Sequence, residues 1–133
     1  MDARRIKIAQ TCLQGAETDT MTFPQIVGTL MREGFESYAI DFRRSSATYY
    51  LPEGDSVVLP THRGEVPIAG AFDGATVREA VREAQQLVPG YTYAGFCTKV
   101  MAAGGAGYIV SFLGRRVVYF GRTAETHVEH FPQ

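Results

Sequence analysis

The sequence has few cysteines and no surplus of either charge. Cys12 and Cys97 are the two cysteines among 133 residues, too few and too far apart for a disulfide framework, and no CxxC pair indicates structural zinc. Thirteen Lys and Arg residues nearly balance fourteen Asp and Glu residues, which gives a formal charge of −1. No overall field therefore attracts nucleic acid or an anionic membrane, and nucleic-acid binding is not expected without a local basic patch.

The sequence also lacks long apolar runs. No segment reaches the roughly eighteen residues needed to cross a bilayer, and the charged start MDARRIKIAQTC has no apolar core of signal-peptide length. We therefore expect no membrane association. Together with the small number of cysteines, this favours a reducing, cytoplasmic location.

What is present is the composition of an ordinary globular protein. Hydrophobic residues make up 45% of the chain and charged residues 20%, with eight Phe and seven Tyr. Disordered and fibrous proteins have a different balance. A chain of this length buries about two thirds of its unfolded surface, so we predict one domain over residues 1–133.

Two stretches of the sequence, residues 22–50 and 92–120, follow one pattern. At a constant shift of seventy residues, six pairs are identical: Thr22/Thr92, Met31/Met101, Gly34/Gly104, Tyr38/Tyr108, Phe42/Phe112 and Tyr49/Tyr119. Conservative apolar and aromatic pairs fall between them. The agreement predicts an internal duplication, with repeats at about residues 4–59 and 75–131.

Each stretch changes from helical to strand periodicity. An apolar stripe at helical spacing comes first, formed in the first stretch by Phe23, Ile26, Val27, Leu30 and Met31. Thr22 is a candidate N-cap with Gln25 in capping-box position, and Gly34 suits the left-handed residue that ends a helix. Alternation over residues 38–42 then predicts a strand with one buried face. The glycine run around Gly104 follows a helix, so we predict a helix C-cap and not a phosphate-binding loop.

Further elements complete a unit of two helices followed by three strands. Helices are predicted upstream at residues 4–14 and 75–88, and strands downstream at residues 47–51, 56–59, 117–120 and 126–131. Residues 60–74 are predicted as a loop with at most one short strand. Two such units predict an α+β domain whose strands form one largely antiparallel sheet, or two related sheets, under a layer of helices.

The second repeat resembles a known family. Its stretch YAGFCTKVMAAGGAGYIVSF, followed by VVYF and HVEHFP, is similar to the YbcV-like family of unknown function, often labelled phage envelope protein. The matching positions are Phe96-Cys97, Ala103-Gly104, Tyr119-Phe120 and the closing Glu129 to Pro132. Where that family tends to carry an aromatic and then an acid, this sequence has Tyr108 and Ser111, so a role for the acid does not carry over. The resemblance implies a small soluble α+β protein.

Cys97 is the candidate nucleophile. It lies on the apolar helical stripe and aligns with Val27, which favours a packing role, because free cysteine commonly behaves as a small hydrophobe. A catalytic cysteine would need a histidine, and the sequence places none of His62, His127 and His130 beside it.

His127 and Glu129 lie two positions apart in a predicted strand and therefore share one face. They are weak candidates for an acid/base pair or for two metal ligands. No third ligand is apparent, and charged side chains commonly protect an edge strand, so a solvated role is favoured. We predict no metal site and no cofactor.

Paired arginines occupy equivalent predicted turns, at Arg43-Arg44 and Arg115-Arg116. If the pseudo-symmetry brought both turns to one side, Arg44, Arg115 and Arg116 could join Tyr49 and Tyr119 in a basic, aromatic-lined surface, with Arg63 and Tyr50 as further members. Such a surface would bind an anionic ligand. The balanced charge favours solvated turns instead.

The leading hypothesis is a non-enzymatic binding module. The groove between the two repeats, or a homodimer surface, would hold an unknown protein or a small anionic ligand. One alternative is a small cysteine-dependent enzyme that uses Cys97 with a histidine. A second alternative, a structural protein derived from a phage or prophage, depends on the family label alone.

Overall fold

Helices and strands follow one another in the order that the periodicity predicts. The computed structural model describes residues 1–132, which form one α+β domain. Its elements are α1 (Ala3–Glu17), α2 (Phe23–Arg32), β1 (Ser37–Asp41), β2 (Ser46–Tyr50), β3 (Ser56–Pro60), α3 (Gly74–Gln86), α4 (Tyr93–Ala102), β4 (Gly105–Ser111), β5 (Arg116–Gly121) and β6 (Thr126–His130). None of the described helices combines the length and hydrophobicity needed to cross a bilayer.

The helices begin at the polar residues that the sequence offers as N-caps. Thr22 caps α2 through a capping box, in which the Gln25 backbone N–H donates to the Thr22 hydroxyl and the Thr22 N–H donates to the Gln25 side chain at 2.8 Å. Thr92 caps α4 in the equivalent place, and its hydroxyl accepts from the Gly95 N–H at 3.0 Å. These bonds satisfy backbone donors that the first helical turn leaves unpaired.

Glycine ends α2 and α4. Gly34 and Gly104 both have left-handed backbones, with φ of 89° and 94°. A residue with a Cβ adopts this conformation only with strain, whereas glycine adopts it freely. The predicted C-cap at Gly104 is therefore confirmed, although the glycines directly after it belong to β4.

The six strands form one antiparallel sheet in the order β3-β2-β1-β4-β5-β6. The two inner strands, β1 and β4, come from different halves of the chain and pair with Ser37 opposite Ser111 and Asp41 opposite Gly107. Each half therefore contributes a three-stranded meander. That the halves arose by duplication stays a prediction.

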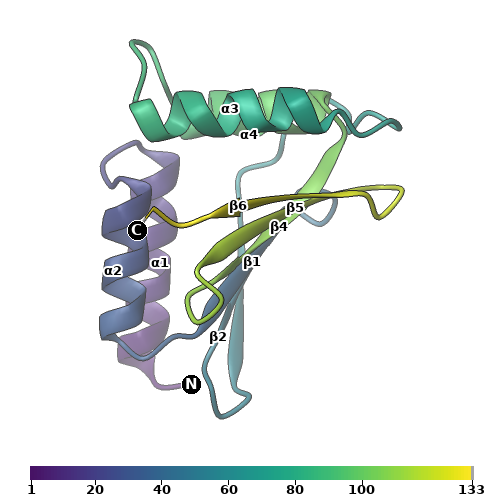
Figure 1. Ribbon diagram of the computed structural model, residues 1–133. Coiled ribbons are helices and arrows are strands. Elements are labelled where there is room, and N and C mark those ends of the chain that lie inside the picture. Colours follow the sequence, from purple (N-terminus) through teal and green to yellow (C-terminus); the bar gives the residue numbers. More distant parts are fainter. Residues whose placement is uncertain (133) are drawn as a thin grey trace.

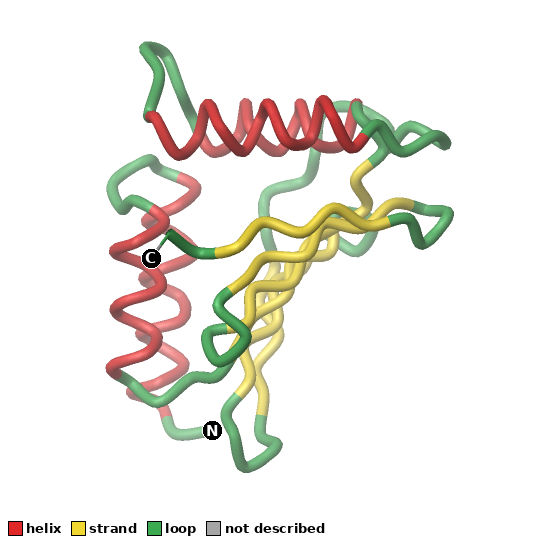
Figure 2. The backbone as a smooth tube through the Cα atoms, viewed as in Figure 1, coloured by secondary structure: helices red, strands yellow, loops and turns green. Residues whose placement is uncertain are grey.

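One face of the sheet carries all four helices (Figures 1 and 2). In Figure 1, α1 and α2 run roughly vertically and α3 and α4 roughly horizontally, and the sheet twists between these two pairs. Contacts of α4 with β4, α3 with β6 and α1 with α4 hold the layers together. Alternate strand residues point into this core, including Tyr38, Ile40, Ala47, Tyr49, Tyr108, Val110, Val117 and Tyr119.

No described helix covers the other face. A row of residues in register crosses it from edge to edge: Val58, Thr48, Ala39, Ile109, Val118 and Val128. Val58 is 63% exposed, Ile109 45% and Val128 38%. The uncovered face thus carries an apolar stripe, which is common at interaction surfaces.

Candidate functional site

Four tyrosines cross the covered face of the sheet in consecutive contact. Tyr49 on β2 stacks on Tyr38 on β1 with ring centroids 5.4 Å apart, and Tyr108 on β4 lies 5.4 Å from Tyr119 on β5. Tyr38 and Tyr108 join the two pairs at 6.5 Å. We call these four residues the tyrosine ladder. Its members are equivalent in the two predicted repeats, and His127 on β6 extends the row at 6.5 Å from Tyr119.

Three hydroxyl groups of the ladder have no hydrogen-bond partner among the described residues. Tyr108 is the exception, because its hydroxyl bonds to that of Tyr93 at 2.7 Å. His127 Nε2 is the single fully enclosed side-chain nitrogen or oxygen without a partner in residues 1–132. The unpaired hydroxyls of Tyr38, Tyr49 and Tyr119 are therefore not fully enclosed, although the three residues are only 5%, 2% and 6% exposed.

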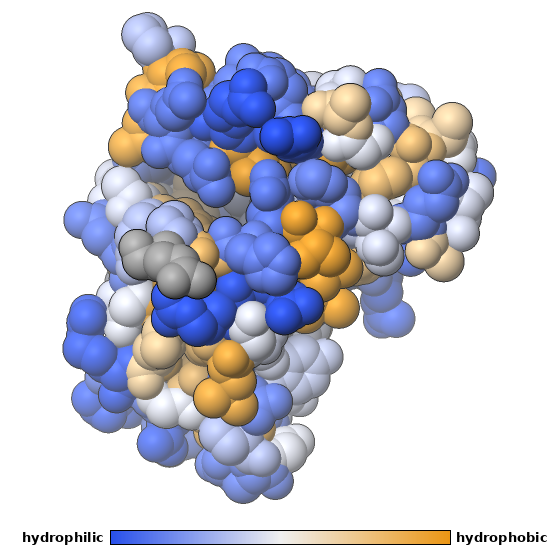
Figure 3. All heavy atoms as spheres, viewed as in Figure 1, coloured by the Kyte–Doolittle hydropathy of each residue, from blue (hydrophilic) through white to orange (hydrophobic). Residues whose placement is uncertain are grey.

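Residues from the start of α4 and the loop before it face the ladder. Tyr91, Tyr93 and Cys97 each keep some accessible surface. Burial is nevertheless the main cause that raises the pKa of Tyr91 and of Cys97 to about 12 each, and that of Tyr93 well above its usual range. These side chains are thus partly accessible although other groups surround them on most sides. Figure 3 shows a hollow between the helix pairs on this side of the molecule.

We call this space the inter-helix recess and define it by Tyr91, Tyr93, Cys97, Tyr119 and Glu129. Tyr93 of α4 bonds to Tyr108, whose ring centroid lies 5.4 Å from that of Tyr119 on β5. The ring of Tyr119 in turn lies 6.5 Å from that of His127, which is next to Glu129 on β6. The recess therefore lies at the junction of elements that are distant in the sequence.

Acidic residues surround the recess. Asp19 in the α1–α2 loop accepts a hydrogen bond from the Tyr93 backbone N–H at 2.8 Å, which ties the first helix pair to the start of α4. Glu17 at the end of α1 is only 13% exposed. Its negative charge adds to the effect of burial and raises the pKa of the Cys97 thiol. Glu129 supplies the third carboxylate from β6.

Cys97 lies in the packed environment that the sequence predicts. The side chain lies against the hydrophobic core. Its pKa of about 12 means that the thiol is protonated at neutral pH, whereas the thiolate is the nucleophilic form. The side chains that act on this thiol are Tyr93 and Glu17, and neither is a histidine.

The structure places His127 and Glu129 on one face of β6, as predicted, but this face is the covered one. Their side chains are 21% and 26% exposed, and His127 Nε2 lies 3.5 Å from Glu129 Oε1. The two side chains are thus partly buried, because alternate residues of this edge strand turn toward the helices. No group of three side chains suited to a metal ion occurs among the described residues.

The expectation of one basic surface from both arginine turns is wrong. Because β1 and β4 are antiparallel, the turn with Arg44 follows the end of β1 that pairs with the start of β4, while the turn with Arg115 and Arg116 lies at the opposite end. Tyr49 and Tyr119, the proposed aromatic partners, are buried on the covered face. Arg115 and Arg116 instead donate to the carbonyls of Pro132 and Gly114.

One arginine turn does line a pocket. Arg43 and Arg63 lie on a polar pocket of about 620 Å³ beside the β1–β2 turn, together with Glu65 and apolar residues such as Phe42 and Met101. Neither arginine forms an ion pair with a described residue. The sequence named Arg63 as a further basic residue, and the structure brings it to Arg43.

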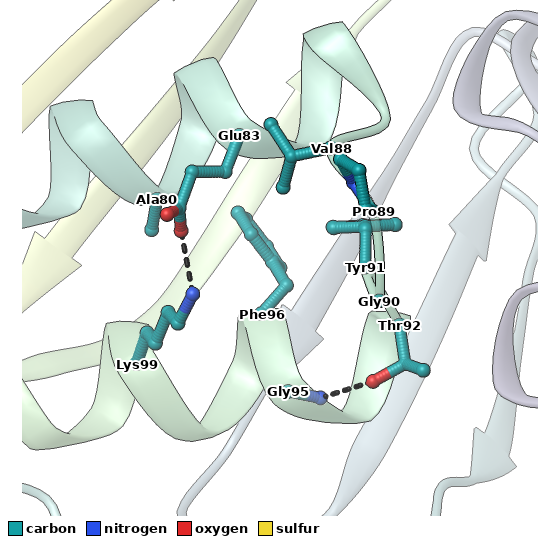
Figure 4. A pocket seen from close by; sticks show the side chains of 10 residues that line it. All are labelled: Ala80, Glu83, Val88, Pro89, Gly90, Tyr91, Thr92, Gly95, Phe96 and Lys99. Carbon is teal, nitrogen blue, oxygen red and sulfur yellow. Dashed lines mark hydrogen bonds and ion pairs between the residues drawn. The ribbon is translucent and has the colours of Figure 1, made fainter.

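A smaller pocket of about 260 Å³ lies between α3 and α4 (Figure 4). The ring of Phe96 points into it, and the ion pair between Lys99 Nζ and Glu83 Oε1, 2.5 Å long, lies along one side. Its charged groups pair with each other, so the pocket presents no unpaired charge to a ligand.

The sequence did not identify the recess as a site. The sequence pattern gives Tyr91 and Tyr93 no role in ligand binding, and it offers Tyr49 and Tyr119 only as members of a basic, aromatic-lined surface. The available signal is the recurrence of tyrosine at equivalent strand positions, Tyr38/Tyr108 and Tyr49/Tyr119, in both predicted repeats.

Comparison with known proteins gives a family but no activity. No curated protein matches the chain. A family described as "Protein of unknown function (DUF1398)" matches residues 11–129, a range that spans every strand except the last residue of β6. The description mentions no phage role and does not bear on that label. The chain belongs to this family of proteins of unknown function.

Proposed function

We propose that the protein is a non-enzymatic binding module that holds a small molecule in the inter-helix recess. The observation that carries this proposal is the set of unpaired hydroxyl groups on the buried residues Tyr38, Tyr49 and Tyr119. Leaving a buried polar group without a partner costs about 1–3 kcal/mol. A bound molecule, or water in its absence, would offset this cost.

Binding is favoured over catalysis by the state of Cys97. A cysteine-dependent enzyme needs a thiolate and a base beside it, and the raised pKa of Cys97 opposes the first requirement. His127 lies beside Glu129 on β6, and no histidine is among the groups that raise or lower the pKa of the thiol. No observation on the described residues favours a structural phage role.

A second candidate is the binding of a small anion at the pocket of Arg43 and Arg63. Two guanidinium groups without ion-pair partners can bind a phosphate or carboxylate through several hydrogen bonds. Under this candidate the β1–β2 turn takes part in anion binding and the β4–β5 turn does not. Glu65 in the same pocket opposes a highly charged anion.

A thermal-shift panel on three proteins tests both candidates. The natural chain, Tyr119→Phe and Arg43→Ala would be screened at low salt against amines, polyols, nucleotides, sugar phosphates, divalent metals and short oligonucleotides. A ligand at a hundredfold its Kd adds about 2.7 kcal/mol, enough to raise the Tm by several degrees. The recess proposal expects shifts that decrease in Tyr119→Phe and persist in Arg43→Ala.

The opposite pattern identifies the arginine pocket. Shifts by anions that persist in Tyr119→Phe, decrease in Arg43→Ala and weaken with added salt would support the second candidate. If no compound in the panel gives a shift that depends on Tyr119, the recess is not the binding site.

A further inference from the structure

We infer that the inter-helix recess binds an organic ammonium ion. This inference rests on the proposed function and adds the chemical class of the ligand. It follows from three properties of the recess: its carboxylates, its aromatic walls and its unpaired hydrogen-bond acceptors.

The charged side chains around the recess are acidic. Glu17, Asp19 and Glu129 approach it from the end of α1, from the α1–α2 loop and from β6. Asp19 accepts a hydrogen bond from the Tyr93 backbone N–H, and Glu129 lies beside His127, whose ring is 6.5 Å from that of Tyr119. The negative charge of Glu17 adds to the burial that raises the pKa of the Cys97 thiol. Lys99, the basic residue of α4, forms an ion pair with Glu83 and therefore does not offset these carboxylates. An anionic ligand would be repelled here, and a cation would be attracted.

Two of the three carboxylates already have partners that hold them in place. Asp19 accepts from the Tyr93 N–H, and Glu17 accepts from the backbone N–H of His62 at 2.7 Å. Glu129 has no described hydrogen-bond donor, and its nearest cationic candidate is the imidazole of His127 at 3.5 Å. No lysine or arginine of the described residues pairs with Glu129, so Glu129 is the residue that a ligand cation would neutralise.

The walls suit a cation with an alkyl group. Three of the five residues that define the recess, Tyr91, Tyr93 and Tyr119, are tyrosines, and an ammonium group is stabilised against an electron-rich aromatic ring. The phenol oxygen of Tyr119 and its neighbours in the ladder can accept N–H bonds, since most of these hydroxyls have no described partner. Burial also favours an apolar substituent, because apolar surface gains free energy on leaving water.

A set of three matched probes tests the ligand class. Butylammonium, 1-butanol and butyrate have similar size and differ in charge. Each would be titrated into the protein at mildly alkaline pH and followed by NMR of backbone amides. We expect butylammonium to shift amide signals of Tyr91, Cys97 and Glu129, and butanol and butyrate to bind at least tenfold more weakly.

Two glutamate variants locate the interaction. Glu129→Gln keeps the shape and removes the charge, so the Kd of butylammonium should rise about tenfold, as expected for loss of one charge-assisted hydrogen bond. Glu125→Gln is the matched control, because Glu125 lies exposed in the β5–β6 turn and bonds to Thr123. Its Kd should stay unchanged. Amide spectra of both variants without ligand show whether the fold is retained.

Other outcomes separate this inference from the proposed function. If butanol binds in the recess as tightly as butylammonium, or if Glu129→Gln has no effect, the recess binds small molecules but the inference of a cation is wrong. If butylammonium gives no shift at the recess while another class in the thermal panel depends on Tyr119, the cation is again excluded and the proposed function stands.

Discussion

The members of the tyrosine ladder differ in whether their hydroxyl group has a hydrogen-bond partner. Tyr108 and Tyr119 are neighbours with rings 5.4 Å apart, and both are buried. Tyr108 bonds to Tyr93, whereas the hydroxyl of Tyr119 has no described partner. The same atom thus contributes to stability in one tyrosine and is available for binding in the other.

Replacing each of these tyrosines by phenylalanine should separate the two roles. Tyr108→Phe removes a hydrogen bond and should lower the free energy of unfolding by about 1 kcal/mol. Tyr119→Phe removes an unpaired hydroxyl and should change it by less than about 0.5 kcal/mol in either direction. Urea denaturation of the two variants measures both values. A larger loss in Tyr119→Phe would mean that this hydroxyl has a structural partner.

Cys97 should be protected from alkylation in the native protein. With a pKa of about 12, its thiolate fraction at pH 7.5 should be roughly a thousandfold below that of an unfolded cysteine, whose pKa is about 8.5. Iodoacetamide modification of a Cys12→Ala variant, with and without denaturant, measures the ratio. Faster modification of the native thiol would revive the cysteine-dependent enzyme.

Among the elements, the ends of α2 and α4 form a matched pair with different surroundings. Gly34 and Gly104 share a left-handed backbone. A Cβ on Gly34 would meet a flexible Arg5 side-chain atom at 3.6 Å, but one on Gly104 would lie 2.1 Å from the carbonyl oxygen of Ala71. Only the second contact forces backbone to move.

The corresponding alanine variants should therefore differ in stability. Gly34→Ala should cost about 1–2 kcal/mol, the strain of a left-handed residue with a Cβ. Gly104→Ala adds a backbone clash and should cost about 2–4 kcal/mol. Denaturation of the two variants under the same conditions gives the comparison. Equal losses would show that the loop at Ala71 moves aside easily.

The elements themselves could be predicted from the sequence because their signals are local. Thr22, Gln25 and Gly34 mark the ends of α2 through bonds and backbone angles that depend on a few neighbouring residues. The position of the arginine turns could not be predicted this way. It depends on the antiparallel pairing of β1 with β4, a contact between distant parts of the chain.

At the scale of the whole molecule, the arrangement of all helices on one side leaves the opposite face of the sheet open. Sequence alternation predicts that one face of each strand is buried, but it does not state whether the other face meets water or a partner. The same limit applies to the candidate site. The sequence offers Tyr49 and Tyr119 as aromatic candidates, but it does not show that the helices cover and bury them.

The open face makes self-association a testable expectation. Ile109 lies in the middle of the apolar stripe, so Ile109→Lys should shift the protein toward monomer in sedimentation velocity measurements at tens of micromolar. Leu87→Lys is the matched control, since Leu87 is 56% exposed at the end of α3 and lies outside the sheet. A natural chain that is monomeric throughout would show that this face has no homodimer role.

The central pairing of β1 with β4 also has a consequence for how the chain folds. Every other strand pair joins neighbours in sequence, and such hairpins form within microseconds. Joining β1 to β4 must close a much longer loop, so we expect it to be the slow step. Until that step is complete, each meander has an unpaired inner edge that can join the complementary edge of another chain. Refolding at high concentration should therefore yield domain-swapped dimers, in which the half-sheets of two chains are exchanged.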